Sequence, residues 1–196
     1  MIKYSFPEYR QCYSYDCGAN IMESVLAYYG FDVSESEVMK LAKTNCKSGT
    51  SITGLKKVAR MFGLKCKEGK LNITFLKKCI KDGKPVVIAL QAWRKKVKNW
   101  KNEWSAGHYV VPIGYDNKRI YFDDPASIFR TFLTFDELKE RWHDQYYING
   151  KSKRLVNWGL IVYGKKPVFK ADEAVHMDYD SFNEKKSVYK KYRRMR

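Results

Sequence analysis

Cys17 has the sequence context of a nucleophile. It follows the polar segment YSYD and precedes Gly18 and a run with helical periodicity, so we expect it in the first turn of a helix. Unpaired backbone N–H groups and the positive end of the helix dipole favour a thiolate at such a position. Asp16 opposes this effect unless its side chain is turned to cap the helix. The competing interpretation is a buried, inert cysteine, which is the more common state of this residue.

A thiolate nucleophile needs a neighbouring base, and the chain has three histidines that could supply one. His108 begins the predicted strand HYVVPIGY directly after Gly107, where the imidazole would be accessible on a rigid support. The alternative for His108 is a partly buried structural histidine. His143 follows a short predicted helix and His176 lies in a polar tail, so we expect both to be solvated surface residues. His108 is therefore the candidate base.

Two further side chains would complete such a site. Asp124 in YFDDPAS ends the next predicted strand across a hairpin from His108, where its carboxylate could orient the imidazole. Strand alternation turns Asp123 to the opposite face, and an aspartate before proline is also a common turn residue. Gln11, six residues before Cys17, is a candidate oxyanion donor together with the Cys17 backbone N–H. Taken alone, Gln11 is most simply a solvated polar residue.

Four short helices are expected in the N-terminal part of the chain. Apolar residues recur there at helical spacing in four segments, and we expect each helix to stop at a glycine. Ser34 and Glu37 have the spacing of a capping box at the start of the second segment. The segments are residues 19–30, 34–43, 52–63 and 73–83.

From Pro85 onward the pattern favours strands. β-branched and apolar runs bounded by glycine, proline and turn residues predict four strands, two of them joined as a hairpin. A short helix capped by Thr134 and Glu137 is expected between the last two strands. Helices followed by strands point to an α+β fold with an antiparallel sheet. The predicted strands are residues 85–93, 108–115, 119–125 and 157–164.

The composition is that of a folded, basic protein. The 196 residues carry a net charge of +17, from 38 Lys and Arg against 21 Asp and Glu, and 44% of them are hydrophobic. No apolar run approaches the ~20 residues of a membrane span, and the N-terminus lacks a signal-peptide core. We therefore expect a cytoplasmic protein. The five cysteines form no C-x-x-C pair, which favours reduced thiols over a disulfide framework or a zinc site.

Two basic segments stand apart from this core. Residues 94–104, RKKVKNWKNEW, are expected to form an exposed loop or hairpin arm. The segment after Gly164 holds ten Lys and Arg against five Asp and Glu, and residues 181–196 have the pattern of a basic amphipathic helix. We divide the chain into a domain of residues 1–164 and a basic, partly helical tail of residues 165–196. These segments suggest an alternative function, the binding of nucleic acid or another anionic surface without turnover, although charge runs are usually just solvated.

The candidate residues also occur in a recognisable order. The segments concerned are Gln11, Asp16-Cys17-Gly18-Ala19, Gly49-Thr50-Ser51, Gly54-Leu55, Gly63-Leu64, Gly107-His108-Tyr109-Val110-Val111 and Asp124-Pro125. With these segments the chain resembles the papain-like cysteine peptidases that process double-glycine leader peptides of bacteriocins, and their stand-alone relatives. The resemblance covers roughly residues 5–163.

This resemblance implies a helical lobe packed against an antiparallel sheet, with the active site between them. It implies Cys17 as nucleophile, His108 as general base and then acid, and no metal or cofactor. It also implies Asp124 as the orienting residue and Gln11 as an oxyanion donor. The substrate would be a peptide or protein, cleaved after a Gly-Gly leader in the most specific case. Because the chain lacks a G-x-x-x-x-G-K-[ST] phosphate loop, we expect a stand-alone member. Transamidation or deamidation through the same acyl-thioester is the alternative activity.

Overall fold

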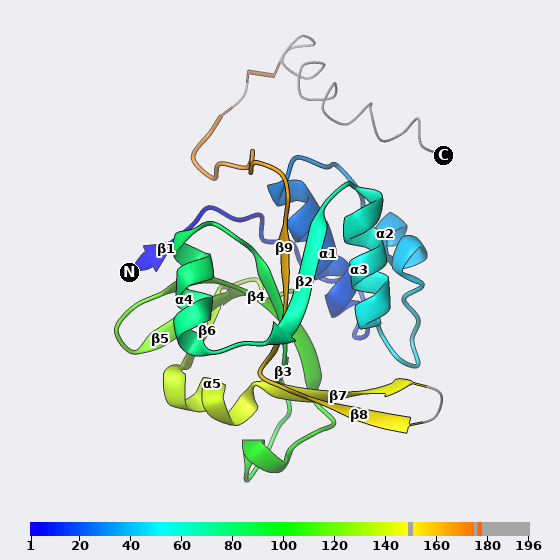
Figure 1. Cartoon of the computed structure of the whole chain (residues 1–196), viewed down its shortest axis with the longest axis vertical. Helices are drawn as coiled ribbons and strands as arrows, with labels where there is room; N and C mark the ends of the chain where they lie inside the picture. Colours follow the sequence, from blue (N-terminus) through cyan, green and yellow to red (C-terminus); the bar gives the residue numbers. More distant parts are fainter. Residues whose placement is uncertain (149–150, 175, 178–196) are drawn as a thin grey trace.

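The computed structural model describes residues 1–148, 151–174, 176 and 177 (Figure 1). Its helices are α1 (Cys17–Tyr28), α2 (Glu35–Ala42), α3 (Ile52–Met61), α4 (Ile73–Lys81) and α5 (Phe135–Arg141), with a short 3-10 turn at Trp100–Asn102. Its strands are β1 (Ile2–Lys3), β2 (Lys65–Lys70), β3 (Val86–Gln91), β4 (Gly107–Tyr115), β5 (Arg119–Asp123), β6 (Thr131–Thr134), β7 (His143–Ile148), β8 (Lys151–Val156) and β9 (Trp158–Tyr163).

The central sheet runs in the order β2-β9-β3-β4-β5-β6, and β1 pairs with the end of β4. The strand pairs of this sheet are antiparallel, which confirms the predicted α+β class. Strands β7 and β8 form a separate ribbon that extends to the lower right of Figure 1. In the sheet, β4 lies between β3 and β5, and His108 sits opposite Leu90 of β3. The start of β4 is therefore a firmly held position.

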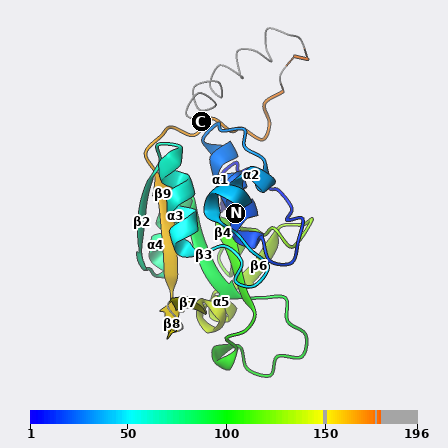
Figure 2. The same ribbon diagram turned by 90° about the vertical axis from the view of Figure 1, so that its right-hand side faces the viewer.

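Helices cover both faces of this sheet. On one face α1, α2 and α3 pack over Val87 and Ala89 of β3. On the other face α4 and α5 pack over Val86, Ile88 and Leu90 of the same strand. Figure 2 shows α1 and α2 on one side of β2 and β9. Because both faces of β3 are buried, the strand is apolar along almost its whole length, as fully covered strands are.

The predicted helices are present, and side chains cap several of them. The Ser51 side chain accepts from the Gly54 N–H at 3.1 Å, and Thr134 and Glu137 form a complete capping box on α5. One expectation was wrong: α2 ends at Ala42, and its C-cap is Lys43 in the left-handed conformation with φ of 57°, not a glycine. The αL position that ends a helix is most easily filled by glycine but is open to other residues.

The basic segment of residues 94–104, called the basic arm below, lies in the loop between β3 and β4, near the bottom of Figure 1. His143 of β7, next to this arm, was predicted to be solvated, but it is buried. Its Nε2 donates to the Glu103 carbonyl oxygen at 2.7 Å, and its ring lies 4.4 Å from that of Trp104. Arg154 also stacks on Trp104, and Arg141 stacks on Trp100. These contacts hold the basic arm in a defined position beside the sheet.

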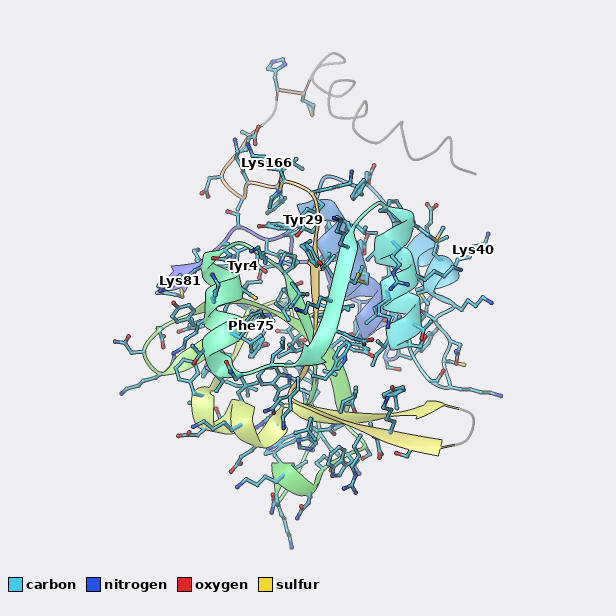
Figure 3. All side chains as sticks on the ribbon, viewed as in Figure 1. Tyr4, Tyr29, Lys40, Phe75, Lys81 and Lys166 are labelled. Carbon is cyan, nitrogen blue, oxygen red and sulfur yellow. The ribbon has the colours of Figure 1, made fainter. Side chains whose placement is uncertain are left out.

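The positive charge of the described residues is distributed over several faces. Figure 3 shows Lys40, Lys81 and Lys166 projecting from different sides of the molecule. Within the arm, Arg94 lies 3.2 Å from a Glu103 carboxylate oxygen. Binding of nucleic acid or another anionic surface stays a prediction.

The segment after β9 returns to the helical side of the molecule. The backbone N–H of Val168 donates to the Tyr28 carbonyl oxygen at 3.1 Å, and the Lys165 ammonium lies over the Phe31 ring. The predicted helix of residues 181–196 lies outside the described residues. In the described part of the chain, no helix combines the length and apolar character that crossing a membrane requires.

Gly18 lets α1 approach β4, and we predict that Gly18→Ala destabilises the protein by about 1–3 kcal/mol. A Cβ at this position would lie 2.7 Å from the Thr50 Cβ and 2.9 Å from the Tyr109 ring, closer than carbon atoms pack. Urea denaturation measures the change. The matched control is Gly69→Ala on β2, where a new Cβ meets nothing within 4 Å. Equal stability of the two variants would show that the helix is not in close contact here.

Candidate active site

Cys17 is the first residue of α1, as the sequence predicted. Its backbone N–H therefore has no acceptor one turn earlier in the helix and remains available to a ligand. Asp16 occupies the N-cap position and is fully buried, but its side chain does not cap the helix. Its Oδ2 accepts from the Tyr13 N–H at 2.9 Å instead, which ties the preceding loop to the helix start. The Cys17 side chain is half-buried at this junction.

The His108 imidazole interacts with both Asp124 and Cys17. Its Nε2 donates to Asp124 Oδ1 at 2.7 Å, and the Cys17 side chain interacts electrostatically with the imidazole. Burial lowers the pKa of His108, but the interactions with Asp124 and Cys17 together outweigh burial and raise the pKa to about 9. The imidazole is 7% exposed, so the expectation of an accessible ring was wrong. A buried ring is better shielded from water and is held by two partners.

Asp124 follows the last residue of β5 and is held by several donors. Its Oδ1 also accepts from the Ala126 N–H at 3.0 Å, while its Oδ2 accepts from Thr131 Oγ1 at 3.0 Å and from the Trp93 indole N–H at 3.2 Å. Burial is the largest single effect and raises the pKa of Asp124, but the charge of His108 and the hydrogen bonds from His108, Ala126 and Thr131 together lower the pKa below its usual value. A carboxylate held in this way is charged at neutral pH and fixed in orientation.

Sequence reasoning did not identify Trp93 and Thr131 as partners of Asp124. Trp93 lies just beyond β3 and takes a left-handed backbone conformation with φ of 60°, a geometry that no apolar pattern indicates. Thr131 begins β6, a strand that the sequence pattern did not reveal. A tryptophan at the end of a predicted strand and a threonine beyond one are both too common to indicate a functional site. Their role becomes visible only when the sheet brings β3, β5 and β6 together.

Gln11 is anchored next to this group of residues. Its backbone N–H donates to the Pro125 carbonyl oxygen at 2.9 Å, which places the residue beside the Asp124-Pro125 turn. Its side-chain Nε2 donates to the Tyr13 carbonyl oxygen, and its Oε1 is buried without a hydrogen-bond partner among the described residues. The structure therefore brings Gln11 near the residues with which the sequence grouped it, with its amide nitrogen bonded to the preceding loop.

The chemistry available to this group is that of thiol and imidazole. Among the described residues, no cluster of His, Cys, Asp and Glu has the arrangement of a metal site. All five cysteines carry free thiols, and Cys17 is the one that raises the pKa of His108. A thiol whose proton can pass to a neighbouring imidazole suits nucleophilic attack on a carbonyl carbon.

The model of the peptidase C39 family matches residues 5–153, which is most of the chain. The chain belongs to the peptidase C39 family. This C39 chain is therefore a cysteine peptidase, in agreement with the class that the sequence predicted. Comparison with the curated proteins finds no match.

Solved structures of C39 domains share the fold of this chain. The peptidase domain of Streptococcus ComA, a bifunctional ABC transporter, is 21% identical, with a TM-score of 0.60 over 84% of this chain and 100% of its own. A double-glycine motif protease from an AMS/PCAT transporter, solved with its leader peptide, is 23% identical, with a TM-score of 0.58 over 85% of this chain and 94% of its own. A putative C39-like peptidase from Bacillus anthracis is 18% identical, with a TM-score of 0.57 over 83% and 96%. These similarities confirm the papain-like fold.

Proposed function

We propose that this C39 chain hydrolyses peptide bonds with Cys17 as nucleophile, His108 as general base and acid, and Asp124 as the orienting residue. The observation that carries the proposal is the environment of one imidazole, which hydrogen-bonds to Asp124 at 2.7 Å and interacts electrostatically with Cys17. A general base must lie within hydrogen-bond reach of the nucleophile, and a third group must fix its orientation. The Asp124 hydrogen bond and the effect of Cys17 on His108 support these roles.

The reaction then follows from the chemistry of these groups. His108 takes the thiol proton to give a thiolate–imidazolium pair, and the Cys17 thiolate attacks the peptide carbonyl carbon. The oxyanion accepts hydrogen bonds from the Cys17 backbone N–H and from the Gln11 amide, once that amide has turned from the Tyr13 carbonyl. The His108 imidazolium gives its proton to the leaving amine, which departs and leaves a thioester. Water, deprotonated by His108, attacks the thioester and releases the carboxylic acid and the free thiol.

The specific substrate that we propose is a peptide with a double-glycine leader. In its support, similar structures include a double-glycine motif protease in complex with a leader peptide. The test compares a synthetic leader peptide ending in Gly-Gly, followed by several residues, with a peptide that has Ala-Ala instead. We expect two fragments that separate after the second glycine, and at least about tenfold slower cleavage of the alanine peptide. Equal cleavage of both peptides contradicts the leader specificity. A deamidated peptide of unchanged length would favour the alternative activity.

We predict that kcat/KM for a peptide substrate falls above about pH 9 and that Asp124→Asn moves this fall to lower pH. The pKa of His108 is raised to about 9, so the imidazolium that protonates the leaving amine persists until that pH. The hydrogen bond and charge of Asp124 raise this pKa, whereas burial lowers it. Without the negative charge of Asp124, burial lowers the pKa of His108 with less opposition. The imidazolium then loses its proton at a lower pH. Initial rates between pH 5 and pH 10 measure the shift.

The control for this profile is Asp116→Asn in the turn between β4 and β5. Asp116 carries the same charge, but its partners are Tyr121 and the turn backbone. We expect this variant to keep the alkaline fall of the unmodified protein. An alkaline fall that stays in place in Asp124→Asn would mean that another group, and not His108, controls it.

A further inference from the structure

Asp144 of β7 is a carboxylate beside the catalytic candidates that the proposed mechanism does not use. Its Oδ1 accepts from the Gln91 side-chain amide at 3.1 Å and from the Gln145 backbone N–H at 2.8 Å. Gln91 is fully buried at the end of β3, and its own Oε1 accepts from the Ala106 N–H at 2.8 Å. A firmly held glutamine thus fixes one oxygen of the Asp144 carboxylate in place.

The Asp144 carboxylate lies directly against Gly107, the residue before His108. A Cβ on Gly107 would lie 2.5 Å and 2.6 Å from the two carboxylate oxygens, so the carboxylate occupies the space of the missing side chain. Asp144 interacts electrostatically with His108 and with Tyr109. Tyr109 also interacts with Cys17 in the same way, which places the carboxylate and the thiol around one residue of β4.

This position is on the face of the sheet that α1 covers. Strand alternation puts the Gln91 side chain on the same face as Val87 and Ala89, which pack in the core with α1, α2 and α3. Gln91 holds Asp144 from that face, and Gly18, next to Cys17, packs against Tyr109, two residues along β4 from the Gly107 that Asp144 contacts. A peptide extended across Cys17 would therefore pass close to the Asp144 carboxylate.

The second oxygen of Asp144 is available to such a peptide. Oδ2 accepts no hydrogen bond from any residue in the described part of the chain, whereas Oδ1 accepts two. Burial raises the pKa of Asp144 to about 6, so the carboxylate is still negatively charged at neutral pH. Burying part of a carboxylate is energetically favourable only when a cation or a hydrogen-bond donor interacts with the oxygen that has no partner.

We propose that Asp144 is a specificity-determining residue that binds a lysine or arginine side chain of the peptide substrate, within two residues of the scissile bond. The inference rests on the proposed peptidase function and adds a preference to it. An ammonium or guanidinium group would donate to Oδ2 while Gln91 and Gln145 keep Oδ1 in place. The competing explanation is that Asp144 serves as a brace between β7 and the start of β4 and has no contact with substrate.

A charge-removing substitution separates these two explanations. In Asp144→Asn the amide oxygen still accepts from Gln91 and Gln145, so the brace remains while the negative charge is lost. The matched control is Asp136→Asn on α5, which removes one charge from a side chain that is 91% exposed and whose ion-pair partner is Lys139. Circular dichroism and thermal unfolding of both variants establish that they are folded.

The experiment uses two series of leader peptides. The first keeps both glycines and places lysine, alanine or glutamate at each of the two positions after the cleaved bond. The second places the same residues at each of the two positions before that bond, where the glycines stand. The measured quantity is the ratio of kcat/KM for the lysine peptide to that for the alanine peptide within each variant. We expect a ratio of on the order of ten- to hundredfold at one position, as for a charge-assisted hydrogen bond. Asp144→Asn should bring this ratio close to one, and Asp136→Asn should keep it.

Each other outcome has a distinct meaning. If lysine is not preferred at any position, or if Asp144→Asn keeps the preference, the inference is wrong and the peptidase function stands. If Asp144→Asn lowers kcat/KM equally for all peptides, Asp144 is a brace, and the specificity role is likewise overturned. If the unmodified protein cleaves none of the peptides, the proposed function itself fails.

Discussion

Replacing Cys17 by alanine is expected to lower kcat/KM for a peptide substrate by on the order of 10⁴ or more, to the limit of detection. The reason is that, in the described part of the chain, Cys17 is the thiol that interacts with His108 and can form the acyl intermediate. The half-buried thiol at the start of α1 is the nucleophile that this imidazole contacts. Hydrolysis of a leader peptide, followed by mass spectrometry of the fragments, measures the loss. The variant should remain folded, because the change removes a single sulfur atom from a partly exposed side chain.

The control for this result is Cys66→Ala. Cys66 is also half-buried, but it lies on β2, at the edge of the sheet and away from the histidine. We expect Cys66→Ala to change kcat/KM by no more than a few-fold. If Cys17→Ala kept its activity, or if Cys66→Ala lost as much, the assignment of the nucleophile would be wrong.

His108→Ala should lower kcat/KM by about 10³-fold or more, because the substitution removes the side chain that acts first as the base and then as the acid. Its effect should not add to that of Cys17→Ala. Residues that act as a unit show non-additive losses, so the double variant should be no worse than Cys17→Ala alone. Measuring residual turnover for the two single variants and the double variant completes this cycle.

His176→Ala is the matched control for the histidine, since His176 is exposed and lies beyond β9. We expect it to keep the activity of the unmodified protein. Residual turnover in His108→Ala that matches the unmodified protein would show that the imidazole neither activates the thiol nor protonates the leaving group. Losses that add in the double variant would show that the two residues act independently.

The sequence predicted the parts of this molecule that local patterns determine. Helical periodicity and caps located the helices, and the sequence placed Cys17 in the first turn of α1, where the structure has it. The order Gln11, Cys17, His108 and Asp124 was sufficient to suggest the family that the comparison then confirmed. Such features depend on residues that are close together in the chain, so the sequence alone reveals them.

Features that depend on distant partners were missed. Strand β2 reads KCKEGK, a lysine-rich segment without strand propensity, and it becomes a strand because β9 pairs with all six of its residues. His143 was expected in water and is buried because the basic arm folds over it. The partners of Asp124 come from β6 and from the end of β3, and Asp144 reaches the site from β7. No local pattern indicates that these segments meet.

The measurement that tests the central claim most directly is the rate at which iodoacetamide alkylates Cys17 between about pH 5 and pH 9. The claim is that Cys17 and His108 form a thiolate–imidazolium pair at the start of α1. We predict that Cys17 is alkylated faster than the other four cysteines at pH 6, and that His108→Ala slows this reaction strongly. Asp124→Asn should slow it less. If alkylation of Cys17 instead rises only near pH 8.5, as for an ordinary thiol, and is unchanged by His108→Ala, the claim is contradicted.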